Sequence, residues 1–309
     1  MIIVPSGIIY LYTYLGAKNM FKIIDKNDID SALNFSWKLY QSPETTSYPI
    51  NMTRKQMTEN FNKSLVQDDD VLLGYYDGNN LTAVFHYYFI EKENYLQTTG
   101  VFIEENYNTV MNAFIDKLKN EYPGYKVVLG FPKENKNANE YCLKNHYNCK
   151  ESATVMKLRP SEFKPSKNNN CITKVTEENF EEYAPFHDNF FAGFFWTSSK
   201  LKDVFNNEQN HWYMFYYKIN EKIEGCSFIR RYEKDNSLEI YGLDFSPEYE
   251  TKENVTALLS YTLKYCFEHI NGITEASDFI DDDNTIEIAA SEELGFRPTN
   301  SYRSYEMIL

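Results

Sequence analysis

The densest group of potential metal ligands in the sequence is acidic and comprises Asp278, Asp281, Asp282 and Asp283. A calcium loop arranges its acidic ligands around a turn glycine and ends on a distal glutamate, and this stretch has neither feature. The group directly precedes a predicted helix, where carboxylates cap the first turn and complement the helix dipole. We therefore expect helix capping and no metal.

Thiols and imidazoles are scattered through the chain without a metal-ligand or catalytic spacing. They are Cys142, Cys149, Cys171, Cys226, Cys266, His86, His146, His187, His211 and His269. Because Cys226 and Cys266 fall on apolar faces, we expect them to be buried structural thiols. Unpaired cysteines favour a reducing, cytoplasmic setting.

The charge balance limits the classes of partner. The chain has 309 residues, of which 42% are hydrophobic, and a formal net charge of −14. A duplex nucleic-acid binder needs a basic footprint that displaces counterions, so nucleic acid is not an expected partner. Acidity favours cationic partners, including amines.

Residues 1–19 are apolar but differ from a membrane segment. Pro5 and Gly7 interrupt the run, which is too short to span a bilayer comfortably, and the first lysine is Lys18. We expect an N-terminal extension that precedes a natural start at Met20 and no membrane association. A signal peptide or interfacial anchor is the alternative.

The remaining sequence predicts the same order of elements twice. In the first half we expect strands near residues 21–24, 71–76, 81–89, 95–103, 126–131 and 154–158, and helices near 28–40, 53–65, 107–122 and 137–145. In the second half we expect strands near 172–175, 212–219, 223–230, 238–245, 273–279 and 302–308, with helices before 205, from about 251 to 270 and at 285–294.

The two halves are an internal repeat. Gly100 and Gly242 are as far apart as Leu81 and Ile223, whereas later landmarks in the halves are several residues further apart. The loop after the fourth strand is therefore shorter in the first copy. A linker rich in proline, serine and asparagine, residues 159–170, separates predicted domains at 20–158 and 171–309.

Two motifs in the second half carry a family resemblance. The first is Leu-Asp-Phe-Ser-Pro-Glu-Tyr at residues 243–249, and the second is Asn284 followed by Leu-Gly-Phe at 294–296. Their spacing resembles that of the acetyl-CoA-dependent N-acetyltransferases known as GNAT. The resemblance covers residues 20–309 and implies an α/β fold with a mixed sheet, built as two tandem acyl-CoA N-acyltransferase-like (GNAT) domains.

The resemblance also implies a cofactor site in the second copy, where acetyl-CoA is the expected co-substrate. Consecutive backbone N–H groups at a helix N-terminus would hold its pyrophosphate, and backbone groups of the fourth strand would hold the pantetheine arm. The implied binding residues are Leu243, Asp244, Phe245, Lys252, Glu253, Asn254, Val255 and Asn284. Glu250 stands at the family's basic position, and Glu253 and Val255 at its glycine positions, so Lys252 supplies the only positive charge.

Catalytic roles follow from the same resemblance. Glu239 occupies the general-base position, with an ordinary strand carboxylate paired to Arg230 or Arg231 as the alternative, and the first copy has Gln97 there. The resemblance also implies a tyrosine that acts as general acid, and at its position this sequence has Ser291 in the second copy and Cys142 in the first.

An aromatic run that includes Phe191, Phe194 and Trp196 occupies the segment that lines the acceptor pocket in this family. Helix packing is the alternative interpretation of this run.

The sequence therefore predicts an N-acyltransferase that moves an acetyl or other acyl group from acetyl-CoA to an amine by direct attack. The expected partner is a small-molecule or peptide amine, and the expected assembly is a monomer or homodimer. Two alternatives remain open: a catalytically inactive GNAT-like pair that acts as a binding or regulatory module, and a FemX-like aminoacyltransferase.

Overall fold

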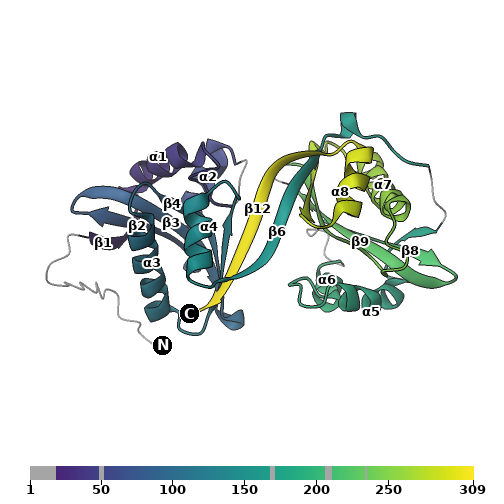
Figure 1. Cartoon of the computed structure of the whole chain (residues 1–309), viewed down its shortest axis with the longest axis horizontal. Helices are drawn as coiled ribbons and strands as arrows, with labels where there is room; N and C mark the ends of the chain where they lie inside the picture. Colours follow the sequence, from purple (N-terminus) through teal and green to yellow (C-terminus); the bar gives the residue numbers. More distant parts are fainter. Residues whose placement is uncertain (1–18, 49–51, 168–170, 206–210, 234) are drawn as a thin grey trace. The chain divides into compact units, whose positions relative to one another are not determined.

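The computed structural model describes residues 19–48, 52–167, 171–205, 211–233 and 235–309. Spatial contacts divide the chain into two compact units. Unit 1 contains the chain up to Cys149 and the terminal segment Ser304–Leu309, and unit 2 contains Lys150–Arg303. Each unit is a sheet covered by helices on both faces (Figure 1). All but the last residue of the predicted extension, residues 1–19, lies outside the described residues.

Unit 1 follows the predicted element order. Its elements are β1 (Asn19–Ile23), α1 (Ile29–Tyr40), α2 (Arg54–Lys63), β2 (Asp70–Asp77), β3 (Asn80–Ile90), a 3-10 turn η1 (Glu91–Glu93), β4 (Tyr95–Ile103), α3 (Tyr107–Glu121), β5 (Lys126–Phe131) and α4 (Lys136–Lys144). The strands lie in the order β1-β2-β3-β4-β5. All neighbours are antiparallel except β4 and β5, which are parallel.

The helices of unit 1 cover opposite faces of its sheet. Helices α1 and α2 pack on Leu72, Val84 and Phe102, while α3 and α4 pack on the opposite face. Helix α3 forms because its apolar residues recur at helical spacing, and Val110, Met111, Phe114, Ile115 and Leu118 are all buried.

Unit 2 repeats this arrangement. Its elements are β6 (Asn148–Leu158), η2 (Pro160–Glu162), β7 (Ile172–Lys174), α5 (Phe180–Phe190), α6 (Ser198–Phe205), β8 (Trp212–Ile219), β9 (Lys222–Tyr232), β10 (Ser237–Phe245), α7 (Lys252–His269), β11 (Glu275–Asp281), α8 (Thr285–Leu294) and β12 (Arg297–Ile308). Strands β6 and β12 belong to unit 2 only between Lys150 and Arg303. Helices α5 and α6 cover one face with Trp212, Met214 and Phe228, and α7 and α8 cover the other with Leu238, Ile240 and Ala276. The predicted repeat of a mixed α/β module is confirmed.

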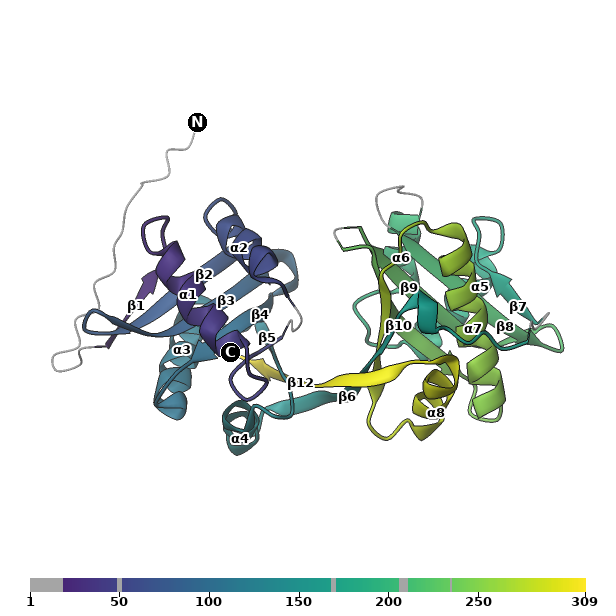
Figure 2. The ribbon, with the colours of Figure 1, turned by 90° about the horizontal axis from the view of Figure 1, so that it is seen from above.

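Two strands make the units differ from the predicted domain boundaries. The sequence repeat assigns β6 to the first copy and β12 to the second. In the structure, β6 pairs antiparallel with β11 of unit 2 from Leu158 to Ala153. The end of β12 completes unit 1 instead, where Leu309 exchanges backbone hydrogen bonds with Gly124 and Tyr125 beside β5 (Figure 2). The units therefore follow strand pairing rather than the predicted limits of 20–158 and 171–309.

The predicted linker, residues 159–170, is described up to residue 167 and packs on unit 2. Lys164 N–H donates to the Leu294 carbonyl, and Ser166 N–H donates to Ser260 Oγ on α7. Gly295 ends α8 with φ +106°, and a Cβ there would lie 2.4 Å from the Glu162 carbonyl oxygen. The Leu-Gly-Phe glycine is thus required both by the helix end and by the linker passing over it.

Removing the terminal segment Ser304–Leu309 is expected to destabilise unit 1, although the segment follows unit 2 in sequence. Tyr305 is fully buried, and its hydroxyl donates to Asn139 Oδ1 at 2.8 Å. Loss of a buried aromatic ring costs about 3–5 kcal/mol, and Tyr305→Phe, which removes only the hydrogen bond, about 1 kcal/mol. Hydrogen exchange should show lost protection in β2–β5 and unchanged protection in β8–β10. Equal loss in both units would contradict the assignment of this segment.

Candidate functional site

The candidate site of unit 2 lies where two parallel strands separate. Strand β10 pairs with β11 only from Ser237 and Glu275 to Ile240 and Asp278. The pairing of β10 with β9 is irregular between Ile240 and Gly242, so Tyr241 is an extra residue that forms a β-bulge. Beyond the bulge, the backbone of Gly242–Phe245 has no partner on its β11 side within the described pairing. We call this opening the unit 2 splay.

Unit 1 has the same backbone feature. Strand β4 pairs with β5 only from Tyr95 and Lys126 to Gln97 and Val128. Its pairing with β3 is irregular next to His86, which leaves Thr99 as the extra residue. We call the opening beyond it the unit 1 splay.

The unit 1 splay is filled by the chain itself. Ser47 Oγ accepts a hydrogen bond from Val101 N–H of β4 at 2.7 Å, and Tyr48 N–H donates to the Gly130 carbonyl of β5 at 3.0 Å. Asn135 donates its side-chain amide to the Thr46 carbonyl at 2.8 Å. These contacts place residues 46–48 across the opening and use backbone groups of both diverging strands. Unit 1 therefore offers no free slot for a pantetheine arm along this path.

Ser47→Ala is expected to destabilise unit 1, because Ser47 is 1% exposed and the buried Val101 N–H would lose its acceptor. The expected loss is about 1–3 kcal/mol, measured by urea denaturation. Ser161→Ala, at an exposed position of η2, is the control. Equal stability of both variants would show that residues 46–48 do not close the splay.

A buried polar network that the sequence did not suggest holds the bulge of unit 1. His86 Nε2 lies 2.6 Å from Asp70 Oδ1, and His86 Nδ1 lies 2.7 Å from Thr99 Oγ1. His86 and Asp70 are 5% and 8% exposed. These residues come from three successive strands, so no spacing in the sequence identifies them as a group.

Glu239, the predicted base, lies on β10 at the point where pairing with β11 is about to end. Burial raises the pKa of its carboxyl to about 7, and this increase is opposed by a hydrogen bond from Tyr232 and by the charge of Arg230. Arg230 is its register partner on β9, which also agrees with the alternative that the sequence left open. A carboxyl that titrates near neutral pH is suited to take a proton from an amine.

The turn between β10 and α7, predicted to hold a pyrophosphate, binds itself instead. The N–H groups of Tyr249 and Glu250 both donate to the Ser246 carbonyl, and Thr251 N–H donates to Tyr249. Thr251 then caps α7 by accepting from Asn254 N–H. The N–H donors that this mode of phosphate binding requires are largely occupied.

The side chains of the predicted cofactor residues are also engaged. Lys252 forms an ion pair with Glu293 of α8 at 2.6 Å. Asn254 donates to the Tyr249 carbonyl, and Phe245 N–H donates to Asp244 Oδ1, its neighbour in sequence. Val255 is buried in the core and Glu253 is exposed on the first turn of α7. Leu243 follows the bulge and is paired with Ser227 of β9, so its backbone lies at the start of the unit 2 splay.

Carboxyl groups surround the unit 2 splay. Burial raises the pKa of Asp278 to about 8 and that of Asp244 to about 6, and it raises the pKa of Glu287 well above its usual range. Asp278 and Asp244 are among the charges that raise the pKa of Glu287 further. Glu287 is tied to Asn284, the predicted cofactor residue, which caps α8 and donates its amide to Glu287 Oε2. Asp278 and Glu287 therefore keep their protons at neutral pH, and these carboxyl groups supply no positive charge for a phosphate.

Asp278→Asn is expected to remove a pH dependence from the stability of unit 2. Because the folded-state pKa of Asp278 is raised, folding holds its proton, and its contribution to stability is lost as pH rises from about 4 to about 8. The wild type should lose stability relative to Asp278→Asn between pH 5 and pH 8 in urea denaturation. Asp283→Asn, at an exposed neighbouring position, should follow the wild type. Parallel curves for all three proteins would contradict the buried titration.

The aromatic acceptor residues separate into different environments. Phe191 is 7% exposed, and its ring lies where a Cβ on Gly242 would meet it at 2.6 Å. The ring of Trp196 lies 4.7 Å from that of Trp212, whereas Phe194 is 49% exposed. Phe191 therefore covers the bulge, and Trp196 adjoins the same face of the sheet.

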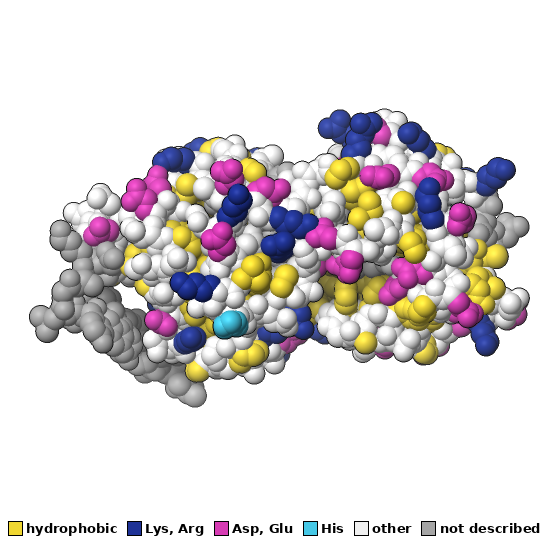
Figure 3. Space-filling model, in the orientation of Figure 1, with side chains coloured by type: hydrophobic (Ala, Val, Ile, Leu, Met, Phe, Trp, Pro, Cys, Tyr) yellow, Lys and Arg dark blue, Asp and Glu magenta, His cyan; other side chains and the backbone are white. Residues whose placement is uncertain are grey.

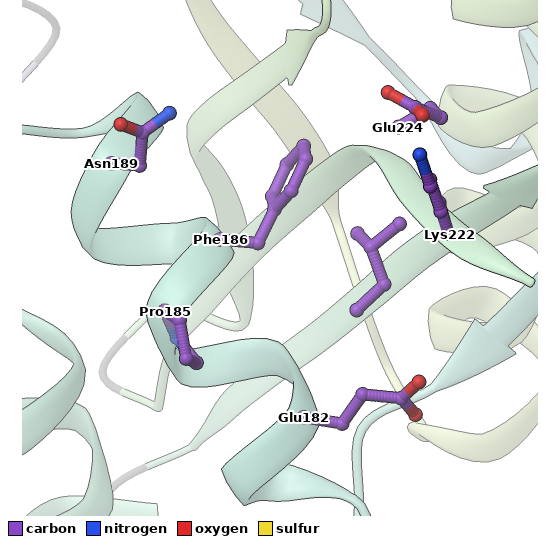
Figure 4. Close-up of a pocket in the computed structure, with 7 residues that line it drawn as sticks. Glu182, Pro185, Phe186, Asn189, Lys222 and Glu224 are labelled. Carbon is purple, nitrogen blue, oxygen red and sulfur yellow. The ribbon is translucent and has the colours of Figure 1, made fainter.

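An open groove of about 460 Å³ lies between α5 and the start of β9 (Figure 4). Phe186, Pro185 and Ile223 give it an apolar centre, and its polar residues are Glu182, Asn189, Lys222 and Glu224. Glu182 is paired with Lys218 at 2.6 Å, and Ser246 Oγ donates to Glu224 Oε2. The Ser246 contact connects this groove to the turn at the end of β10.

The structure also places the cysteines and aspartates that the sequence singled out. Cys226 and Cys266 are buried and unpaired, as predicted. Asp282 accepts hydrogen bonds from Ser152 and Thr154, while the cap of α8 is Asn284 rather than the aspartates, so the predicted capping role was wrong. Within the described ranges, no cluster of three potential ligands is placed to hold a metal ion, and no helix combines the length and apolar character needed to cross a membrane. On the face drawn in Figure 3, acidic and basic side chains are interspersed.

Comparisons with known proteins show the fold. No protein-family description matches the sequence, and no curated protein matches it either. A GCN5-related N-acetyltransferase from Sphaerobacter thermophilus matches 94% of this chain and 96% of its own, with 10% identity and a TM-score of 0.63. A tandem GNAT protein from the clavulanic acid biosynthesis pathway matches 94% of this chain and 98% of its own, with 10% identity and a TM-score of 0.56.

A putative acetyltransferase from Pyrococcus horikoshii also matches, over 94% of this chain and 90% of its own, with 10% identity and a TM-score of 0.51. The chain therefore has the tandem GNAT acetyltransferase fold, which confirms the fold class predicted from the sequence. At this identity the likeness establishes the fold and leaves the activity to be argued from the site.

Proposed function

We propose that unit 2 transfers an acyl group from the thioester of acetyl-CoA to an amine of a small molecule or peptide. The acyltransferase fold supports this proposal, as do the bulge and splay of β10 and the position of Glu239 beside them. The single observation that carries the proposal is a half-buried carboxyl with a pKa of about 7 at the edge of the splay. The filled splay of unit 1 supports the assignment of chemistry to unit 2 alone.

The reaction is a direct attack with Glu239 as the general base. The amine nitrogen forms a bond to the thioester carbonyl carbon, the carbon–sulfur bond breaks, and the amine proton passes to the Glu239 carboxylate directly or through one water. A carboxyl group whose pKa lies near the working pH is present partly as the carboxylate, which can accept the amine proton, and partly as the acid, which can release that proton again. No covalent enzyme intermediate is formed.

The donor would be held mainly through its pantetheine arm. Backbone groups near Leu243 can hold an extended amide chain, whereas the β10–α7 turn has its donors occupied and carries Glu250 and Glu253. We therefore expect S-acetylpantetheine and acetyl-CoA to bind with affinities that differ by less than about tenfold, or about 1.4 kcal/mol. Isothermal titration of the full chain with each compound measures this difference.

Glu239→Gln is expected to lower kcat for acetyl transfer by about 10²–10⁴-fold, the usual contribution of a general base. In the wild type, kcat should rise with pH to a plateau, with a midpoint near the Glu239 pKa of about 7, because only the carboxylate accepts the proton. Release of free thiol reports the rate. Glu233→Gln, at an exposed position directly after β9, is the control. A wild-type rate in Glu239→Gln would remove Glu239 from the mechanism.

A second candidate function is a catalytically silent pair that acts as a binding or regulatory module. It is favoured by residues 46–48 across the unit 1 splay and by Asp278, Glu287 and Asp244 around the unit 2 splay. Isothermal titration with acetyl-CoA distinguishes the two candidates. Binding that competes with S-acetylpantetheine supports acyl transfer, and no heat with either compound supports the silent pair.

A further inference from the structure

Unit 2 contains a chain of hydroxyl groups that ends at the proposed base. Tyr232 Oη lies 2.5 Å from Tyr241 Oη. The Glu239 carboxylate accepts a hydrogen bond from Tyr232. The three side chains come from the end of β9 and from β10, and they lie beside Arg230. The hydrogen-bonded side chains follow one another in the order Tyr241, Tyr232 and Glu239.

Tyr241 is placed by the bulge itself. It is the residue that interrupts the pairing between Ile240 and Gly242, immediately before the backbone groups expected to hold the thioester. Its ring centroid lies 4.9 Å from that of Trp212 and 6.2 Å from that of Phe228. These contacts fix the ring on the face of the sheet that α5 and α6 cover.

The residue that the family uses as an acid does not serve here. Ser291 stands at that position, is fully buried, and its hydroxyl has no hydrogen-bond partner among the described residues. Without a hydrogen-bonded partner in the described part of the chain, the Ser291 hydroxyl has no route by which a lost proton could be returned to it. The departing group therefore needs another proton source.

We propose that Tyr241 is the general acid of unit 2 and that Tyr232 returns a proton to it from Glu239. This inference rests on the proposed acyl transfer. As the carbon–sulfur bond breaks, the Tyr241 hydroxyl gives its proton to the thiolate. Tyr232 then protonates Tyr241 and takes the proton that Glu239 removed from the amine. Each group returns to its starting protonation state, and one proton has moved from nitrogen to sulfur.

The charge of Glu239 determines when the two tyrosines release their protons. Burial raises the pKa of Tyr232 and of Tyr241, and the negative charge of Glu239 raises both further. When Glu239 accepts the amine proton, that charge disappears, so both tyrosines become stronger acids at the step that needs them. The other charged groups that interact with Glu239 are Arg230, Asp278 and Glu151.

The hydrogen-bonded chain can be tested without any acceptor. In full-length protein labelled with ¹³C at the glutamate carboxyls, the resonance lost in Glu239→Gln identifies Glu239, and its pH titration gives the midpoint. Tyr232→Phe removes a hydrogen bond to the charged carboxylate and should raise the midpoint by about one pH unit. Tyr241→Phe should raise it by less, because it weakens the Tyr232 bond only indirectly.

Tyr213→Phe is the matched control, since Tyr213 lies on β8 of the same unit and packs toward Tyr265. Its Glu239 midpoint should equal that of the wild type. The relay is overturned if Tyr232→Phe also titrates like the wild type. If Tyr232→Phe does not fold, the relay is overturned when Tyr241→Phe shows the same Glu239 midpoint as Tyr213→Phe.

A kinetic measurement separates the relay from the proposed function. With acetyl-CoA as donor and benzylamine as probe acceptor, Tyr241→Phe should lower kcat at least tenfold relative to Tyr213→Phe, with little change in KM. Equal kcat values would overturn the acid role of Tyr241 while leaving acyl transfer intact. If no thiol is released by any form, the proposed acyl transfer fails, and the midpoint shifts alone decide whether the hydrogen-bonded chain exists.

Discussion

Both units depend on one backbone constraint, the separation of two parallel strands that are paired at only one end. In each unit a bulge in the fourth strand of the module shifts its register against the antiparallel neighbour, so the strand turns away from its parallel partner. The separation leaves unpaired backbone N–H and C=O groups in the interior, and such groups require partners. What supplies those partners decides what each unit can do.

The two units meet this requirement differently. In unit 1, residues 46–48 supply the partners from within the chain, and Asp70, His86 and Thr99 form a buried network at the bulge. In unit 2, no described segment is hydrogen-bonded across the splay as residues 46–48 are in unit 1. Phe191 covers the bulge, and the carboxyl groups of Asp278 and Glu287, which have raised pKa values, lie on the neighbouring elements. The unit 1 splay is thus closed by the chain itself, whereas the unit 2 splay is bordered by buried carboxyl groups with raised pKa values.

Much of the fold followed from the sequence because periodicity and turn chemistry are local properties. The helix at 107–122, the strand pair around Asp77-Gly78 and the final Leu-Gly-Phe glycine were all predicted close to their observed positions. The role of the last strand in unit 1 was not predicted, because a strand's partner depends on distant residues. The plug at 46–48 and the Tyr232–Tyr241 contact were missed for the same reason: neither has a motif, and both are created by register and by the bulges.

Hydrogen exchange of the full chain with and without acetyl-CoA tests most directly whether acetyl-CoA binds at the unit 2 splay while the unit 1 splay stays closed. We expect new protection at residues 237–245 of β10 and at the start of α7, with no change at residues 95–103 of β4 or around residues 46–48. Protection confined to β4, or no change anywhere at saturating acetyl-CoA, would contradict it.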